Sequence, residues 1–157
     1  MDRSRSRSQV TSISVGSDFS TDSAAATEDL AARLAGRFEA GDLLLLEGGL
    51  GAGKTTFVRG LVRGLGGNPS RVQSPTFTLV RHYPSGLGRA PLAHVDLFRL
   101  ESGGEVAILG LDELLENHIV AVEWGERLRL DYPRTIQLAF SDAGRDRRRI
   151  RVVEWYS

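Results

Sequence analysis

The sequence predicts an α/β fold, with a mixed parallel and antiparallel central sheet that is flanked by helices and ends in a C-terminal β-hairpin. Short apolar runs alternate with amphipathic helical segments in the first half of the chain. Strand-like segments joined by turn residues dominate the second half, which indicates antiparallel pairs. A glycine-rich loop also joins one apolar run directly to a helical segment, a connection that is typical of α/β proteins.

Length and composition restrict the class of protein. The chain has 157 residues, of which 41% are hydrophobic and 25% charged, as is usual for one globular domain. It contains no cysteine, which excludes disulfide frameworks and thiolate metal sites. The formal net charge is zero, so bulk attraction to nucleic acid or to a membrane is not expected to drive function. No apolar run has the length of a membrane span or of a signal-peptide core, and we expect a cytoplasmic protein.

The N-terminal segment differs in composition from the rest of the chain. Residues 1–22 are rich in Ser and Arg, and such a segment buries too little apolar surface to fold by itself. We predict a disordered leader over residues 1–22 and a single domain over residues 23–157. A nucleic-acid-binding tail is the alternative for the leader.

Residues 26–42 are predicted to contain a helix with recognisable ends. Its apolar residues recur at helical spacing and are Leu30, Leu34 and Phe38. Glu28 and Asp29 suit the first turn, where carboxylates face the positive end of the helix dipole. Gly41 suits the end of the helix.

A buried strand and a second helix are expected next. Residues 42–48 (DLLLLEG) form a short apolar run that stops at a glycine, as a buried strand does. Residues 54–65 have helical periodicity, and Gly66 and Gly67 close the segment. The apolar residues on the shared face of this helix are Phe57, Leu61, Val62 and Leu65.

The second half of the chain is predicted to contain two antiparallel pairs and one more buried strand. Residues 77–98 contain two strand-like segments around the turn PSGLGR. Residues 103–118 are expected to form one or two short helices, and residues 119–124 (IVAVEW) a buried strand. Residues 134–140 and 148–155, joined by SDAGRDR, predict the C-terminal hairpin.

Residues 48–55 (GGLGAGKT) match the phosphate-binding loop G-x-x-x-x-G-K-[ST] at every fixed position. Glycines let successive N–H groups of such a loop point at one anion, and the following helix N-terminus adds partial positive charge. A glycine-rich turn that matches by chance is the alternative, but the strand before and the helix after favour a nucleotide site. The predicted nucleotide-binding residues are Gly48, Gly49, Leu50, Gly51, Ala52, Gly53, Lys54, Thr55 and Thr56.

Lys54 is the only lysine among the 20 Lys and Arg residues of the chain. A compact ammonium on a flexible stem fits a narrow nest of N–H groups and reaches the β- and γ-phosphates, whereas a planar guanidinium does not. We therefore predict Lys54 as a catalytic residue. The hydroxyl of Thr55 is predicted to bind Mg²⁺, and Thr56 is expected near the α-phosphate.

A phosphate loop also needs a carboxylate to complete the coordination of Mg²⁺. Glu123 ends the most apolar strand, and Asp96 lies within AHVDLFR. Both are predicted as catalytic residues and metal ligands, one directly and the other through water; an ion pair with an arginine, such as Asp96 with Arg99, is the alternative. His94 shares a strand face with Asp96 and is expected in the core or behind the ligands. Trp124 is expected to pack rather than to stack on a base.

The segment SPTF, residues 74–77, carries two further candidate residues. The hydroxyls of Ser74 and Thr76 can contact the γ-phosphate or its metal and order the loop only with triphosphate bound. A strand entry fixed by proline, with a local hydroxyl-to-backbone bond, explains the segment equally well. No motif marks the adenine pocket, for which Thr27 is only a candidate.

Four motifs in this order resemble the TsaE family: GGLGAGKTTFVRGLVRGLG, SPTFTLV, HVDLFRL and VEWGERL. TsaE proteins are small P-loop ATPases required to form threonylcarbamoyladenosine (t6A) at position 37 of tRNAs that read codons beginning with A. The resemblance covers about residues 25–155. It implies a P-loop NTPase-like fold, with ATP and Mg²⁺ as cofactors.

The resemblance also assigns roles to residues. It places the loop lysine and threonine at Lys54 and Thr55, the switch-like segment at residues 74–76, and the two carboxylates at Asp96 and Glu123. One position departs from the family, in which Asp often follows the first loop glycine, whereas this chain has Gly49. A carboxylate there can help to place a water or the switch loop, so the departure concerns hydrolysis rather than nucleotide binding.

The family resemblance implies an accessory role. TsaE-like proteins bind a TsaD-like transferase and its TsaB-like partner, and ATP binding and hydrolysis are thought to reset the transferase between turnovers. Contact with tRNA is then expected to be indirect, through the complex, and no membrane is involved. Hydrolysis by the isolated chain is expected to be slow, because only Arg99 is a weak candidate for an arginine finger.

Three other functions compete with this prediction. A small nucleotide or metabolite kinase uses the same loop, but it needs an arginine-rich lid that the sequence after Leu65 lacks. A GTPase needs an N-K-x-D element, and the single lysine of the chain is already in the phosphate loop. A non-catalytic interaction module with a vestigial nucleotide site is the third alternative.

Overall fold

The computed structural model describes residues 13–49, 51–73, 80–86, 88–97, 110–123 and 132–156. Its strands are β1 (Asp18–Thr21), β2 (Leu43–Glu47), β3 (Val80–Tyr83), β4 (Leu92–Asp96), β5 (Ile119–Glu123), β6 (Thr135–Asp142) and β7 (Arg148–Trp155). Its α-helices are α2 (Ala24–Leu34), α3 (Lys54–Gly64) and α5 (Leu111–Asn117). Two short 3₁₀ helices are η1 (Ala35–Arg37) and η2 (Pro69–Arg71). Among the described residues, no helix combines the length and the hydropathy of a transmembrane segment.

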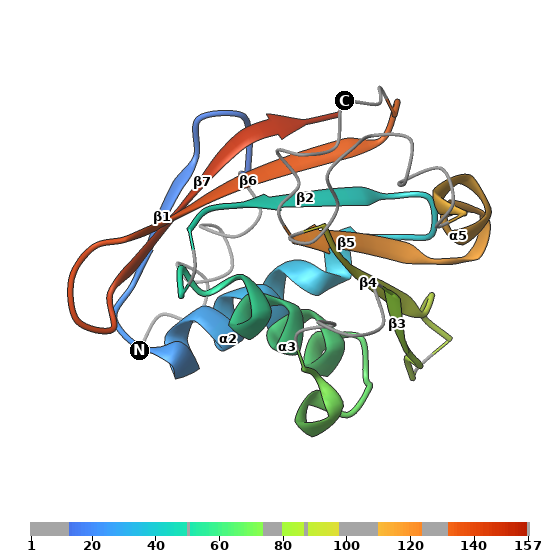
Figure 1. The fold of residues 1–157 in the computed structure, drawn as a ribbon, viewed down its shortest axis with the longest axis horizontal. Helices are drawn as coiled ribbons and strands as arrows, with labels where there is room; N and C mark the ends of the chain where they lie inside the picture. The colour runs from blue at the N-terminus through green and yellow to red at the C-terminus, as the bar shows by residue number, and fades with distance from the viewer. Residues whose placement is uncertain are drawn as a thin grey trace, which may run out of the picture.

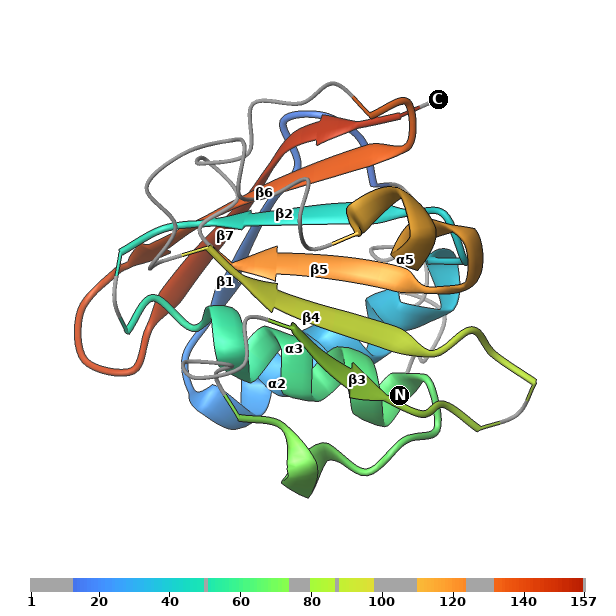
Figure 2. The same ribbon diagram turned by 45° about the vertical axis from the view of Figure 1, so that its right-hand side comes forward.

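The described strands form one seven-stranded sheet in the order β1-β7-β6-β2-β5-β4-β3. Helices α2 and α3 cover one face of this sheet, and α5 lies on the other (Figures 1 and 2). Side chains along β2 alternate between the two faces of the sheet. Leu44 and Leu46 pack in the core beneath α2 and α3, and Leu43 and Leu45 pack in the core beneath α5. The predicted α/β fold with a mixed sheet is confirmed.

The centre of the sheet is parallel and its two sides are antiparallel. Strand β2 pairs in parallel with both β5 and β6, and β4 pairs in parallel with β5. The two predicted antiparallel pairs are confirmed as β3–β4 and β6–β7. Because parallel strands end at the same edge of a sheet, the C-terminal ends of β2, β4 and β5 meet beside the start of α3.

The predicted leader is too long at its C-terminal end. Residues Asp18–Thr21 form β1, which pairs antiparallel with β7 through the register Asp18↔Arg151 to Thr21↔Arg148. The polar composition of this segment gives no strand signal, because an edge strand buries little apolar surface. Phe19 is the apolar residue of β1 that packs against the core. Residues 1–12 lie outside the described part of the chain.

The first helix begins two residues earlier than predicted, at Ala24. Ser23 is its N-cap, and the Ser23 hydroxyl accepts a hydrogen bond from the Ala26 N–H at 3.0 Å. Glu28 and Asp29 therefore lie beyond the first turn, where both pair with Arg63 of α3, at 3.3 and 2.6 Å. The helix ends at Leu34 and continues as η1, so Gly41 does not end it.

Helices α2 and α3 approach closely because two glycines of α3 face α2. A Cβ atom at Gly60 would lie 2.2 Å from the carbonyl oxygen of Glu28 and 2.6 Å from the Cβ of Ala31. A Cβ at Gly64 would lie 2.4 Å from the carbonyl oxygen of Ala32. Such distances leave room for hydrogen only, so the spacing of the two helices depends on these glycines.

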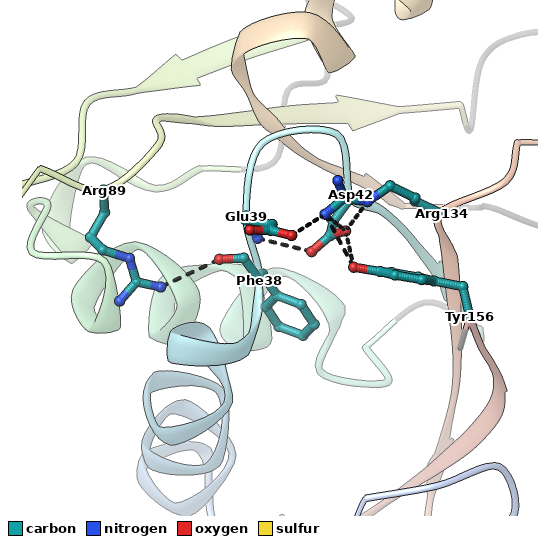
Figure 3. A network of polar contacts seen from close by, with 6 residues as sticks. All are labelled: Phe38, Glu39, Asp42, Arg89, Arg134 and Tyr156. Carbon is teal, nitrogen blue, oxygen red and sulfur yellow. Dashed lines mark hydrogen bonds and ion pairs between the residues drawn. The ribbon is translucent and has the colours of Figure 1, made fainter.

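A polar network lies beside the N-terminal end of β2 (Figure 3). Asp42 is fully buried just before β2; its Oδ1 accepts hydrogen bonds from Arg134 (Nη2, 2.8 Å) and the Tyr156 hydroxyl (2.6 Å), and its Oδ2 accepts one from the Glu39 N–H (2.8 Å). The pKa of Arg134 is raised mainly by its hydrogen bond to Tyr156 and further by the Asp42 carboxylate. The pKa of Tyr156 is raised mainly by burial and further by Asp42. Nearby, Arg89 donates to the Ala35 carbonyl at 2.9 Å and to the Phe38 carbonyl at 3.4 Å, which satisfies carbonyls at the end of η1.

We expect Asp42→Ala to lower the free energy of unfolding by about 2 kcal/mol, because it removes the buried acceptor that Arg134, Tyr156 and the Glu39 N–H share. Glu39→Ala is the matched control. Glu39 Oε1 contacts the same guanidinium at 2.7 Å, but its side chain is 73% exposed, so its loss should cost less than about 1 kcal/mol. Urea denaturation measures both values. Equal losses in the two variants would contradict a central role for the buried carboxylate.

Candidate functional site

The phosphate loop follows β2 and curls through backbone conformations that suit glycine. Gly48 has φ 145° and Gly53 has φ 98°. At Gly48 space is also limiting, because a Cβ there would lie 2.5 Å from the carbonyl oxygen of Phe140 in β6. Gly53 caps α3 without a side chain, so no side-chain oxygen bonds the N–H groups of the first helical turn. This combination is typical of a cradle for an anion.

Lys54 begins α3 and is folded back across the loop. Its side chain is 5% exposed, and its Nζ donates a hydrogen bond to the carbonyl oxygen of Gly48 at 2.7 Å. The ammonium therefore lies between the two ends of the loop. Because the Lys54 side chain is nearly buried, its charge is screened little by solvent and acts strongly on any anion bound at the loop.

Thr55 connects the loop to the end of β5. Its hydroxyl lies 3.0 and 3.1 Å from the two carboxylate oxygens of Glu123, to which it donates. Glu123 is 4% exposed, and its Oε2 is also in hydrogen-bond contact with Nε2 of His94 on β4. The carboxylate is thus held from α3 on one side and from β4 on the other.

Asp96 lies beside Glu123 in the sheet. The parallel register of β4 and β5 pairs these two residues directly, and Asp96 is 6% exposed. The sequence left the division of roles between the two carboxylates open. In the structure, Glu123 is the one that accepts from Thr55. His94 is completely buried on the same strand as Asp96, as expected for a residue behind the ligands.

The structure brings together the loop, Lys54, Thr55, Glu123 and Asp96. Gly49 of the loop is exposed, and no atom lies within 4 Å of a Cβ built on it. Several other predicted residues cannot be placed. The predicted site residues outside the described part of the chain are Leu50, Ser74 and Thr76. Arg99 and Trp124 also lie outside it.

No sequence motif indicates the residues that border the loop on its outer side. Gly53 faces the β6–β7 hairpin, since a Cβ built on Gly53 would lie 3.5 Å from Cγ of Arg148. A cavity of about 740 Å³ lies between the β1–α2 junction and this hairpin. Its lining residues are Ser20, Thr21, Asp22, Ala26, Ser141, Asp142, Ala143, Arg147, Arg148 and Arg149. Thr27 does not line the cavity but is hydrogen-bonded at 2.7 Å to Thr21, which does.

Arg148 is fixed within this wall. Its Nη1 donates to the carbonyl oxygens of Arg147 at 2.8 Å and Arg145 at 3.1 Å, and pairs with Oδ1 of Asp142 at 3.3 Å. The guanidinium is therefore held by its own hairpin turn, while the aliphatic stem faces Gly53. No local motif marks this contact, because it joins residues almost a hundred positions apart.

Comparison with known proteins identifies a family. The family model "Threonylcarbamoyl adenosine biosynthesis protein TsaE" matches residues 21–151. A protein of Streptomyces coelicolor named tRNA threonylcarbamoyladenosine biosynthesis protein TsaE is 46% identical over 69% of this chain and 79% of its own. A Bacillus subtilis protein of the same name is 43% identical over 70% of this chain and 68% of its own.

A solved structure shows the same fold. The crystal structure of Bacillus subtilis YdiB superposes with a TM-score of 0.66 and 33% sequence identity, covering 87% of this chain and 83% of that one. The extent of the family match, from β1 into β7, includes the phosphate loop and both carboxylates. The chain therefore belongs to the TsaE family.

Proposed function

We propose that this protein binds ATP with Mg²⁺ and hydrolyses it in support of t6A formation on tRNA. One observation carries the proposal: the hydroxyl of Thr55, at the end of a phosphate loop, donates to the buried carboxylate of Glu123. That contact joins a cradle for phosphates to the residue best placed to support a metal ion. The family match supplies the connection to t6A.

The donors at the site fit Mg²⁺. They are hard oxygen atoms, namely the Thr55 hydroxyl and the carboxylates of Glu123 and Asp96, which is the ligand type that Mg²⁺ prefers. Thr55 would hold the ion directly, and Glu123 would orient Thr55 and the metal-bound water. Bound Mg²⁺ supplies positive charge that offsets the charge on the phosphate oxygens.

The residues of the chain divide the remaining work. The N–H groups of the loop and of the first turn of α3 bind the phosphates. Lys54 places its ammonium against the oxygens on which negative charge is spread during transfer to water. Asp96 or Glu123 orients the attacking water. Ser74 and Thr76 remain candidates for contact with the γ-phosphate.

We propose a site for the nucleoside next to the phosphates. The cavity between the β1–α2 junction and the β6–β7 hairpin measures about 740 Å³ and adjoins the loop through the contact of Arg148 with Gly53. Its size is in the range of small-molecule sites. We assign the adenosine moiety to this cavity.

The partners follow from the family. We propose a TsaD-like transferase with a TsaB-like protein as the complex that the ATPase serves, in the cytoplasm, with tRNA contacted through that complex. A pull-down with the transferase pair, with and without ATP, tests the association. Retention of both proteins only when ATP is present would support a nucleotide-controlled complex, and no retention in either condition would contradict it.

Calorimetry with Mg-ATP and an assay of phosphate release without any acceptor test the chemistry. We expect binding of ATP in preference to GTP, slow release of inorganic phosphate, and a loss of about 100-fold in hydrolysis rate in Glu123→Gln, which removes the negative charge beside Thr55. Glu116→Gln, on the exposed side of α5, is the control and should hydrolyse ATP like the wild type. Absence of ATP binding by the wild type would refute the proposal, and phosphate release only with an acceptor would indicate a kinase.

A further inference from the structure

The hydrogen-bond contact of the buried His94 with Glu123 indicates a role beyond packing. His94 has no exposed surface, and its Nε2 contacts Oε2 of Glu123. An ionised carboxylate can only accept hydrogen bonds, so Nε2 of His94 carries the hydrogen in this contact. His94 is therefore a donor aimed at one oxygen of Glu123.

The other ring nitrogen has a different environment. Within the described part of the chain, Nδ1 of His94 is buried and has no hydrogen-bond partner. Burying a polar atom in this way costs about 1 to 3 kcal/mol. An apolar side chain of similar volume would avoid this cost, so packing alone does not explain a histidine at this position.

Glu123 needs a hydrogen-bond donor besides Thr55, because the Thr55 hydroxyl is also the proposed ligand of Mg²⁺. Thr55 spreads one hydroxyl hydrogen over both carboxylate oxygens, at 3.0 and 3.1 Å. The oxygen of that hydroxyl is the proposed ligand of Mg²⁺, so its position must suit the ion as well. A donor on β4 fixes Oε2 independently of α3.

Asp96 makes this fixation more important. The sheet register places Asp96 directly beside Glu123, and both carboxylates are nearly buried. Two like charges at neighbouring positions repel each other and favour rotation of one side chain away from the site. A hydrogen bond from His94 opposes that rotation at Glu123.

We propose that His94 is a positioning residue that holds Glu123 in the orientation needed for Mg-nucleotide binding. This inference rests on the proposed nucleotide function. His94 does not touch the nucleotide in this arrangement and acts through Glu123. Its removal should therefore weaken the contribution of Mg²⁺ to nucleotide affinity and leave the affinity for metal-free nucleotide unchanged.

Titration of a fluorescent ATP analogue into the full chain, once with Mg²⁺ and once with EDTA, tests this. We expect His94→Leu to lose about 10- to 100-fold in affinity with Mg²⁺, as is usual for residues that support metal ligands, and nothing in EDTA. His94→Gln, whose amide N–H can replace the Nε2 donor, should recover most of the affinity with Mg²⁺. Thermal unfolding should show His94→Leu folded, since removal of the unpartnered Nδ1 offsets part of the cost of losing the donor to Glu123.

The outcomes separate this inference from the proposed function. Unchanged Mg-dependent affinity in His94→Leu would overturn the positioning role and leave the ATPase assignment intact. An equal loss of affinity with Mg²⁺ and in EDTA, or no recovery in His94→Gln, would also overturn it by indicating a purely structural role. A wild-type chain that binds the nucleotide in neither condition would overturn the proposed function, and this inference with it.

Discussion

Gly60→Ala is expected to lower the free energy of unfolding by about 3 kcal/mol, although alanine is the better helix former. The added methyl group would lie 2.2 Å from the carbonyl oxygen of Glu28, which belongs to the backbone of α2 and cannot rotate away. Helices α2 and α3 would have to separate, and the core below them contains Leu30, Leu34 and Phe57. Intrinsic propensity favours alanine by about 1 kcal/mol, so a net loss measures the strength of the packing constraint.

Gly36→Ala is the matched control for this substitution. Gly36 lies in η1, is exposed, and has no atom within 4 Å of a Cβ built on it. Its replacement should leave stability unchanged or raise it by about 0.5 kcal/mol. Chemical denaturation of both variants gives the comparison. A Gly60→Ala variant with the urea midpoint of the wild type would show that α2 and α3 are not in the close contact described.

Lys54→Ala is expected to reduce kcat/KM for ATP hydrolysis by about 100-fold or more. The ammonium is almost fully enclosed and reaches back to Gly48, so it lies where phosphate oxygens would bind. No other lysine exists in the chain to replace it. Calorimetry with Mg-ATP measures nucleotide binding by the variant, and an assay of phosphate release measures its hydrolysis rate.

Lys54→Arg should not restore hydrolysis, because a planar guanidinium is bulkier than the buried ammonium that donates to Gly48 and cannot take its place as a point charge. Arg37→Ala, an exposed cation in η1, is the control for a simple loss of charge and should resemble the wild type. Full activity in Lys54→Arg would show that charge alone matters at this position. Full activity in Lys54→Ala would contradict a catalytic role for the loop.

The central part of the fold and the core of the candidate site could be predicted because both depend on local patterns. The apolar run of β2, the loop glycines and the periodicity of α3 adjoin one another in the sequence, and the structure has them in the same arrangement. Glu123 and Asp96 can also be predicted as carboxylates for the metal of the loop, since each ends or lies in an apolar strand. Their pairing in the register of β4 and β5 agrees with that expectation.

Features that depend on distant contacts could not be predicted. Strand β1 has a polar composition, and only its pairing with β7, more than a hundred residues away, makes it a strand. The contact of Arg148 with Gly53 and the acceptor role of Asp42 likewise join distant segments. The start of α2 was missed for a local reason, because three alanines carry no amphipathic signal and the cap at Ser23 precedes the first periodic residue.

The pairing of β1 with β7 also limits how far the chain can be shortened. The family match begins at residue 21, so a cut chosen from similarity alone would remove most of β1. The outer backbone of β7 from Arg148 to Arg151 would then face solvent as a bare rim. Rims of this kind recruit strands from other molecules, so such a shortened protein would tend to self-associate even with its nucleotide loop unaltered.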